Sequence, residues 1–481
     1  MVARNATSAC PLHLNRRRFL KGVGASALAM KMGLFEMASS LLGEQPKPEG
    51  ACRVMAAFAR PDVDAYWLGW PGTAYDIPGH QKMYTETMRK AAEQLGVALD
   101  VQQEPLHDDK TLAAYQEKVA QAAPDGVLLV CMSLNAGWKY IHQFLEKRGE
   151  TPVPTVVFSP MGTSFTGQLQ PSRTAKRAFV GATQDVEWLG TALRMLKTVY
   201  DMARTRICIV RGDKVVDRKL DVIGTTLHTV PHAKFYEAHE QVAESDEMRE
   251  MAAWYKKTAK KIVEPTDQDL LAAAKNYVVC RKVMQDEQCH GYSMDCLGPV
   301  GQKRMQPPCL ALSHFRDEGI VGSCEADWNA AISERLTHLL FNRPGFMQDP
   351  APNTVRNTLM AAHCTCGARL KGCDQDPEPF ILRSHSESNL GVSMQVLWPV
   401  GARITIMKFV GPEKIILGTG EIVANIDTPP SGGCRTSVEC TVDGLADSRD
   451  TKGFHQLLIW GDVEDEFKAY CSLAGIEVEH I

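Results

Sequence analysis

Short apolar segments alternate with longer segments of helical period from residue 51 onward, and this alternation restricts the fold more than any other feature of the chain. The first apolar segments lie at residues 52–58, 97–102, 126–132 and 155–160. The segments between them, such as 79–95 and 109–122, have the length and apolar spacing of helices. Strands separated by helices of this length favour a parallel sheet that is covered on both faces. We therefore expect an open, Rossmann-like α/β domain over residues 51–175.

The alternation continues in a second block and then ends. Residues 176–345 repeat apolar strand-like and amphipathic segments, so a second open α/β domain is expected there. After Pro350, β-branched residues alternate with polar ones between Gly and Pro turns, a pattern that is typical of antiparallel strands. The fold class we predict is α/β, with two consecutive Rossmann-like domains followed by a β-rich, barrel-like C-terminal domain over residues 346–481.

The N-terminus contains a run of three arginines, Arg16 to Arg18, followed by Phe19, Leu20, Lys21 and a mildly apolar stretch. This arrangement resembles a bacterial twin-arginine signal, which implies export of the folded protein to the periplasm. The alternative is a basic amphipathic terminus of a cytoplasmic protein, since Lys31 interrupts the apolar stretch. The stretch is too short and interrupted for a stable membrane span. Residues 1–50 are assigned to this leader and its linker.

Charge and cysteine content narrow the function classes. A formal net charge of -4 gives no broad basic surface, which disfavours nucleic acid as a partner and leaves small molecules. The 15 cysteines do not follow the regular spacing of a disulfide framework, so buried thiols are expected. Cys364, Cys366 and Cys373 beside His363 could form a zinc site, but without paired CxxC units the structural interpretation is preferred.

Two carboxylates stand out at the ends of one predicted helix. Glu325 follows the apolar segment 320–324, where a parallel strand would end at the sheet edge that binds ligands. Asp327 is a candidate N-cap of the helix. Asp349 follows a turn at Pro344 and Gly345 and is expected at the exit of a short strand. If the carboxylates of Glu325 and Asp349 converge, a divalent cation is the simplest explanation; the alternative is two solvated loop residues.

The segment 308–350 and the order of domains resemble the L-fucose and L-arabinose isomerase superfamily. Recognisable motif extends over residues from about 308 to 365 and from about 452 to 478. Fucose isomerase has an E-x-D motif whose glutamate precedes a metal-binding aspartate by 24 residues. Glu325, Asp327 and Asp349 reproduce this spacing. The resemblance implies that Glu325 and Asp349 bind a divalent metal, expected to be Mn²⁺, together with a histidine of the C-terminal domain. His455 is our choice for that histidine, and His363 and His385 are rivals.

The same resemblance implies a function. A sugar would be isomerised between aldose and ketose through an enediol, with Glu325 and Asp349 as the base and acid, in a homo-oligomer. Trp138 and His80, in loops that follow strands of the first domain, are further candidates for sugar contact. The chain is shorter than typical fucose isomerases, and an export signal is unusual for intracellular sugar catabolism, so the sugar is left open. The alternative function is an exported sugar-binding protein without catalysis.

Overall fold

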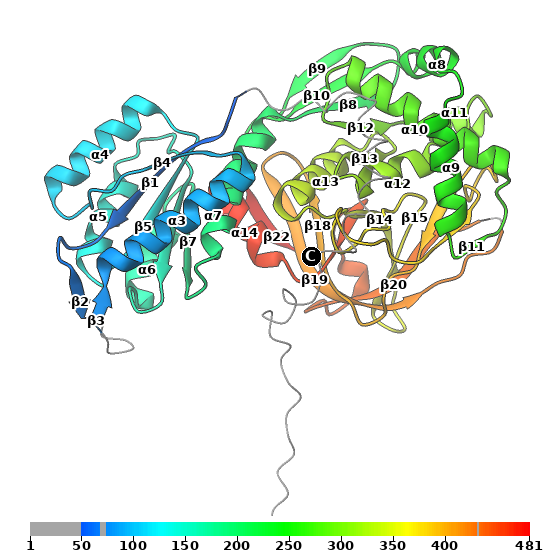
Figure 1. Cartoon of the computed structure of the whole chain (residues 1–481). Helices are drawn as coiled ribbons and strands as arrows, with labels where there is room; N and C mark the ends of the chain where they lie inside the picture. Colours follow the sequence, from blue (N-terminus) through cyan, green and yellow to red (C-terminus); the bar gives the residue numbers. More distant parts are fainter. Residues whose placement is uncertain (1–49, 68–73, 431) are drawn as a thin grey trace, which may run out of the picture. The chain divides into compact units, whose positions relative to one another are not determined.

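The computed structural model describes residues 50–67, 74–430 and 432–481 (Figure 1). The twin-arginine prediction for residues 16–21, like nearly all of the predicted leader, lies outside the described residues. Among the residues that are described, none of the helices has the combination of length and apolar character that crossing a membrane requires.

The first sheet is parallel, with the strand order β4-β1-β5-β6-β7. Its strands are β1 (Arg53–Ala59), β4 (Ala98–Val101), β5 (Gly126–Cys131), β6 (Thr155–Pro160) and β7 (Ala178–Thr183). The helices that accompany it are α3 (Ile77–Leu95), α4 (Asp109–Ala122), α5 (Ala136–Glu146), α6 (Thr166–Arg173) and α7 (Trp188–Arg204), and a small hairpin is formed by β2 (Ala65–Trp67) and β3 (Ala74–Asp76).

Alternate residues of β1 pack against different helices, as a doubly covered sheet requires. Val54 and Phe58 share a core with residues of α3 and α7, whereas Met55 and Ala57 share a second core with residues of α4 and α5. The expected α/β architecture of this region is confirmed. Its extent differs from the prediction, because β7 pairs with β6 and the sheet therefore continues to Thr183, beyond residue 175.

The second sheet has the order β13-β12-β8-β10-β9 and is parallel except for its edge strand β9. Its strands are β8 (Arg206–Val210), β9 (Val216–Lys219), β10 (Thr226–Val230), β12 (Gly291–Met294) and β13 (Val321–Cys324). The helices of this region are α8 (His232–Gln241), α9 (Asp246–Thr258), α10 (Asp267–Asp286), α11 (Leu297–Gly301), α12 (Cys309–Asp317) and α13 (Trp328–Phe341).

The C-terminal region forms a closed barrel, as predicted. Its strands follow the order β18-β21-β14-β15-β20-β19, and the pairing of β18 with β19 closes the ring. They are β14 (Phe346–Asn353), β15 (Thr358–His363), β18 (Arg403–Phe409), β19 (Lys414–Asn425), β20 (Thr436–Val442) and β21 (Gln456–Trp460). The 3₁₀ turn η2 (Ser448–Asp450) and the helix α14 (Glu464–Ala474) flank β21, and β22 (Glu477–His480) pairs with β19.

A small separate sheet crosses the predicted domain boundary. Its order is β11-β16-β17, with β11 (Lys261–Ile262), β16 (Phe380–Arg383) and β17 (Ser393–Val396). Because β11 comes from the second α/β region and pairs with β16 of the C-terminal region, these two regions share backbone hydrogen bonds.

Candidate metal centre

Glu325 lies in a tight turn between β13 and α13. Its φ is 57° and that of Ala326 is 53°, so two consecutive non-glycine residues occupy the left-handed region. Such residues cost roughly 1–3 kcal/mol each and are concentrated at functional sites. Asp327 then caps α13, because its side chain accepts a hydrogen bond from the Ala330 amide at 3.0 Å. The predicted N-cap is confirmed, and Glu325 lies at the carboxyl end of a parallel strand as expected.

Three neighbouring barrel strands place the other candidate residues together. Asp349 pairs across β14 and β15 with Ala362, the neighbour of His363. Gln348 pairs across β14 and β21 with Gln456, the neighbour of His455. Asp349 is thus inside an eight-residue strand, not at the exit of a short one as predicted. His455 also has a left-handed φ, of 56°.

The carboxylates and imidazoles converge at short range. His455 Nε2 lies 3.3 Å from Asp349 Oδ1 and 3.5 Å from Glu325 Oε2. His363 Nε2 lies 3.6 Å from Glu325 Oε1. Both histidines are buried, whereas the side chains of Glu325 and Asp349 are 28% and 37% exposed, so the cluster is open to solvent on its carboxylate side. We call these four residues the candidate metal centre.

The imidazole of His455 is held through its other nitrogen. Its Nδ1 lies 2.9 Å from Asp327 Oδ2, which also accepts a hydrogen bond from Lys408 Nζ at 2.7 Å. Lys408 in turn donates to the carbonyl of Phe454. Because Asp327 engages Nδ1, the Nε2 atom of His455 is directed into the cluster.

His363 has a comparable support. Its Nδ1 lies 3.2 Å from the Thr365 hydroxyl, to which Arg316 donates at 3.0 Å. Arg316 forms a fully buried ion pair with Glu334 of α13 at 2.6 Å. The ion pair therefore connects α12 and α13 to the strand end that carries His363.

The pKa shifts follow from this geometry in the metal-free chain. Contacts with His363 and then His455 hold the pKa of Glu325 well below its usual range, although burial opposes this. Burial raises the pKa of Asp349 despite the two imidazoles. Burial lowers the pKa of His455, but its hydrogen bond to Asp327 and its contact with Glu325 raise it by more, to about 9. Protonated histidine thus separates the two carboxylates when no cation is bound.

The donor set fits a divalent metal. Donor atoms of Asp349, His363 and His455 all lie within 4.8 Å of one another. Asp349 Oδ1 and His455 Nε2 are buried and form an ion pair at 3.3 Å, but neither makes a hydrogen bond, so both keep a lone pair or proton for another group. Imidazole and carboxylate donors suit manganese, iron, cobalt and zinc. Sequence reasoning missed one neighbour of this cluster, Cys324, whose sulfur forms a second close group with Glu325 and His363.

Other predicted site residues are placed elsewhere. His385 bonds Ser388 through Nδ1 at 3.0 Å and belongs to neither donor group among the described residues. Cys366 and Cys373 donate to different backbone carbonyls, so the CTCGARLKGC segment, which is described throughout, forms no zinc site. Trp138 is 2% exposed within α5 and donates to the Thr163 carbonyl at 2.8 Å, which makes it a core residue and not a sugar contact. His80 is half-buried and stacks on Tyr75.

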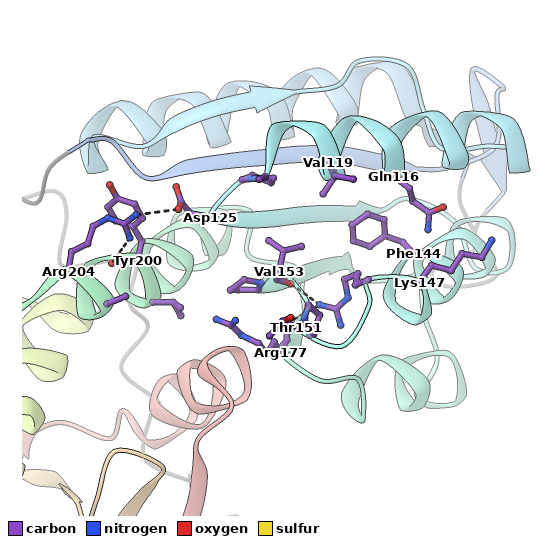
Figure 2. Close-up of a pocket in the computed structure, with 18 residues that line it drawn as sticks. Gln116, Val119, Asp125, Phe144, Lys147, Thr151, Val153, Arg177, Tyr200 and Arg204 are labelled. Atoms are coloured by element: carbon purple, nitrogen blue, oxygen red, sulfur yellow. Dashed lines mark hydrogen bonds and ion pairs between the residues drawn. The ribbon is translucent and has the colours of Figure 1, made fainter. Parts of the chain in front are cut away.

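A cavity of about 500 Å³ lies in the first α/β region (Figure 2). Asp125, Val153 and Arg177, which precede β5, β6 and β7, line it, so it opens at the amino ends of the strands. Ligands of open α/β sheets bind at the opposite edge. Arg148, also in the lining, donates to the carbonyls of Val153 and Lys176, which gives it a structural role. No residue of the candidate metal centre lines this cavity.

Comparison with known proteins identifies no family. No family model matches the chain, and no curated protein matches it. Solved structures that match include a periplasmic solute-binding protein of an ABC transporter from Actinobacillus succinogenes 130z with bound D-allose, at 10% identity and a TM-score of 0.18, over 53% of this chain and 83% of that one. A sugar-binding protein of a sugar ABC transporter from Bacillus halodurans matches at 12% identity and a TM-score of 0.17, over 63% and 91% of the two chains. Similarities of this size carry no argument about function.

Proposed function

We propose that this protein is a metal-dependent aldose-ketose isomerase whose reaction takes place at the candidate metal centre. The observation that carries the proposal is the convergence of Glu325, Asp349, His363 and His455 from four separate segments, with Asp349 Oδ1 and His455 Nε2 buried and without a hydrogen bond. The resemblance of the 308–350 segment to the fucose isomerases supports the reaction class.

Each residue has a defined part in this reaction. His363 and His455 orient the site, because their Nδ1 atoms are engaged by Thr365 and Asp327 and their Nε2 atoms face the carboxylates. Glu325 and Asp349, which are the more exposed members, carry the proton between C1 and C2 of the sugar. A divalent metal, when bound, would polarise the two sugar oxygens at these carbons and lower the cost of forming the enediol.

Metal content tests the site first. The purified full chain is expected to retain a divalent metal, measured by inductively coupled plasma mass spectrometry, and Glu325→Gln, Asp349→Asn and His455→Gln are expected to release it. Glu250→Gln and Asp376→Asn make the same chemical changes at exposed residues and are controls. His385→Gln is a control for the histidines, since His385 lies outside both donor groups. Full occupancy in all three site variants would show that the metal binds elsewhere.

The reaction itself is tested by incubating the metal-loaded protein with a panel of aldoses and ketoses and measuring interconversion by chromatography. Isomerisation that is lost in Glu325→Gln and retained in Glu250→Gln is the expected result. Solvent deuterium that enters the product at C1 or C2 would identify the enediol route. A metal-loaded protein that isomerises none of the sugars would contradict the proposed reaction while leaving the metal site intact.

Sugar binding without catalysis is the alternative function. One of the solved structures reported above contains bound D-allose and the other is named a sugar-binding protein, but their TM-scores give no support to this assignment. Calorimetric titration of sugars into the metal-free and the metal-loaded protein separates the two functions. A simple binding protein needs neither Glu325 nor Asp349, so it would bind sugar without metal. Export remains a proposal that rests on residues 16–21, and the location of the protein after cell fractionation tests it.

A further inference from the structure

Cys324 brings a sulfur atom to the candidate metal centre. It is the last residue of β13, is 4% exposed, and immediately precedes Glu325. The donor atoms of Cys324, Glu325 and His363 all lie within 4.8 Å of one another. Since Asp349, His363 and His455 satisfy the same condition, His363 belongs to both groups. A thiol therefore adjoins a site whose other donors are oxygen and nitrogen.

The backbone explains how two adjacent side chains reach one point. In an extended strand, neighbouring side chains point to opposite faces of the sheet. The left-handed φ of 57° at Glu325 interrupts this alternation directly after Cys324. The Glu325 carboxylate consequently lies on the same side as the Cys324 sulfur, facing His363.

We propose that Cys324 is a ligand of the bound metal and that it makes the site selective for a borderline ion such as Zn²⁺ or Co²⁺ over Mn²⁺. The inference rests on the proposed metal centre and changes its expected occupant, because the resemblance to sugar isomerases implies manganese. Thiolate sulfur selects zinc and other softer ions, whereas manganese is served by carboxylate, carbonyl and water ligands.

The chemistry needs no oxidant. The Cys324 S–H bond breaks as the metal–sulfur bond forms, and the proton passes to solvent, as in other thiolate sites. The sulfur of Cys296 lies 3.9 Å from that of Cys324, within reach of a weak S–H hydrogen bond. Cys296 can thus support a metal-bound Cys324 sulfur and belongs to neither donor group.

X-ray absorption spectroscopy of the zinc-loaded full chain tests the proposal directly. A sulfur neighbour at about 2.3 Å from zinc is expected beside nitrogen and oxygen neighbours at about 2.0–2.2 Å. Cys324→Ser is expected to lose the sulfur signal and Cys296→Ser to keep it, which identifies the thiol. A wild-type spectrum with nitrogen and oxygen alone would overturn the role of Cys324 and leave the proposed metal centre standing. A chain that binds Mn²⁺ but no zinc would likewise overturn the role of Cys324 alone, and a chain that binds no divalent metal would overturn both.

Metal competition gives a second readout that is independent of isomerase activity. The preference of the wild-type protein for Zn²⁺ over Mn²⁺ is expected to fall by at least about tenfold in Cys324→Ser, since changes even outside the ligand shell cost 10–100-fold in affinity. Cys364→Ser is the matched control, because this buried thiol follows His363 but faces Ser386 at 3.4 Å. An unchanged preference in Cys324→Ser would refute the selectivity.

Discussion

Replacing Asp327 separates the two tasks of its carboxylate. Oδ1 accepts the Ala330 amide at 3.0 Å and caps α13. Oδ2 accepts from Lys408 Nζ at 2.7 Å and lies 2.9 Å from His455 Nδ1. An amide side chain has a single acceptor oxygen. Asp327→Asn must therefore give up either the helix cap or the contacts with Lys408 and His455.

The magnitudes decide which contact is lost. A cap is worth about 1 kcal/mol, whereas a hydrogen bond from a charged group is worth about 1.5–3 kcal/mol. The single oxygen of the introduced amide should turn to Lys408, so we expect Asp327→Asn to lower the free energy of unfolding of the metal-free protein by about 1–3 kcal/mol. Asp327→Ala removes the carboxylate partner of Lys408, which is 6% exposed and keeps its hydrogen bond to the Phe454 carbonyl, and a loss of about 3–5 kcal/mol is expected.

Urea unfolding of the metal-free protein, followed by circular dichroism, measures these losses, and metal titration measures the effect on the site. The affinity for the divalent metal should fall about 10-fold in Asp327→Asn and up to about 100-fold in Asp327→Ala. Asp108→Ala is the matched control, because Asp108 caps α4 at 2.7 Å from the Thr111 amide and contacts no residue of the metal centre. If Asp327→Ala costs no more stability than Asp108→Ala and binds metal normally, the proposed support of His455 is refuted.

Three further predictions follow from the same region. Folding raises the pKa of His455 from 6.5 to about 9, so protonation of this imidazole stabilises the metal-free fold. The stabilisation is complete below pH 6.5 and is lost as the pH rises through about 9. The difference in free energy of unfolding between wild type and His455→Gln, measured by urea unfolding at each pH, should therefore shrink over this range. Arg316→Met leaves the buried carboxylate of Glu334 without a cation and should cost about 3–5 kcal/mol in urea unfolding. The added change Glu334→Leu should restore only part of this loss, because it removes the unpaired charge but also the acceptor of the Gly322 amide. Ala326→Gly removes the strain of a left-handed φ of 53° and should raise the midpoint of thermal unfolding. Ala330→Gly, inside α13, should lower this midpoint. The opposite order would contradict strain at this turn.

Local patterns predicted most of the secondary structure because helix and strand periods are visible in short windows. The strand that ends at Cys324 and the helix that begins at Trp328 lie where the sequence indicates. Pairing between distant strands has no such local signature. The assignment of β7 to the first sheet and of β11 to β16 therefore required the structure.

The candidate site was predictable to a different degree for each residue. Glu325, Asp349 and His455 follow from spacing and from the resemblance, and the structure brings them together. His363 could be offered only as a rival of His455, because a single histidine at a strand end has no distinctive context. Cys324 was missed, since neighbouring strand residues normally face opposite sides and the turn at Glu325 is not encoded by a glycine.

The barrel register explains why Asp349 faces Glu325 and lies beside His455. Gln348 and Gln456 are fully buried and hydrogen-bonded to each other at 2.9 Å, in line with Phe346 and Leu458, which belong to the C-terminal core. Because side chains alternate along β14, Asp349 points to the opposite face from Gln348, together with Met347, which packs in the core shared with α13 and Cys324. His455 lies just before β21 and has a φ of 56°, and its Nε2 atom reaches Asp349 Oδ1 at 3.3 Å on the same face. A shift of β14 by one residue would move Asp349 into the barrel interior. The buried amide pair thus fixes the register on which the metal centre depends.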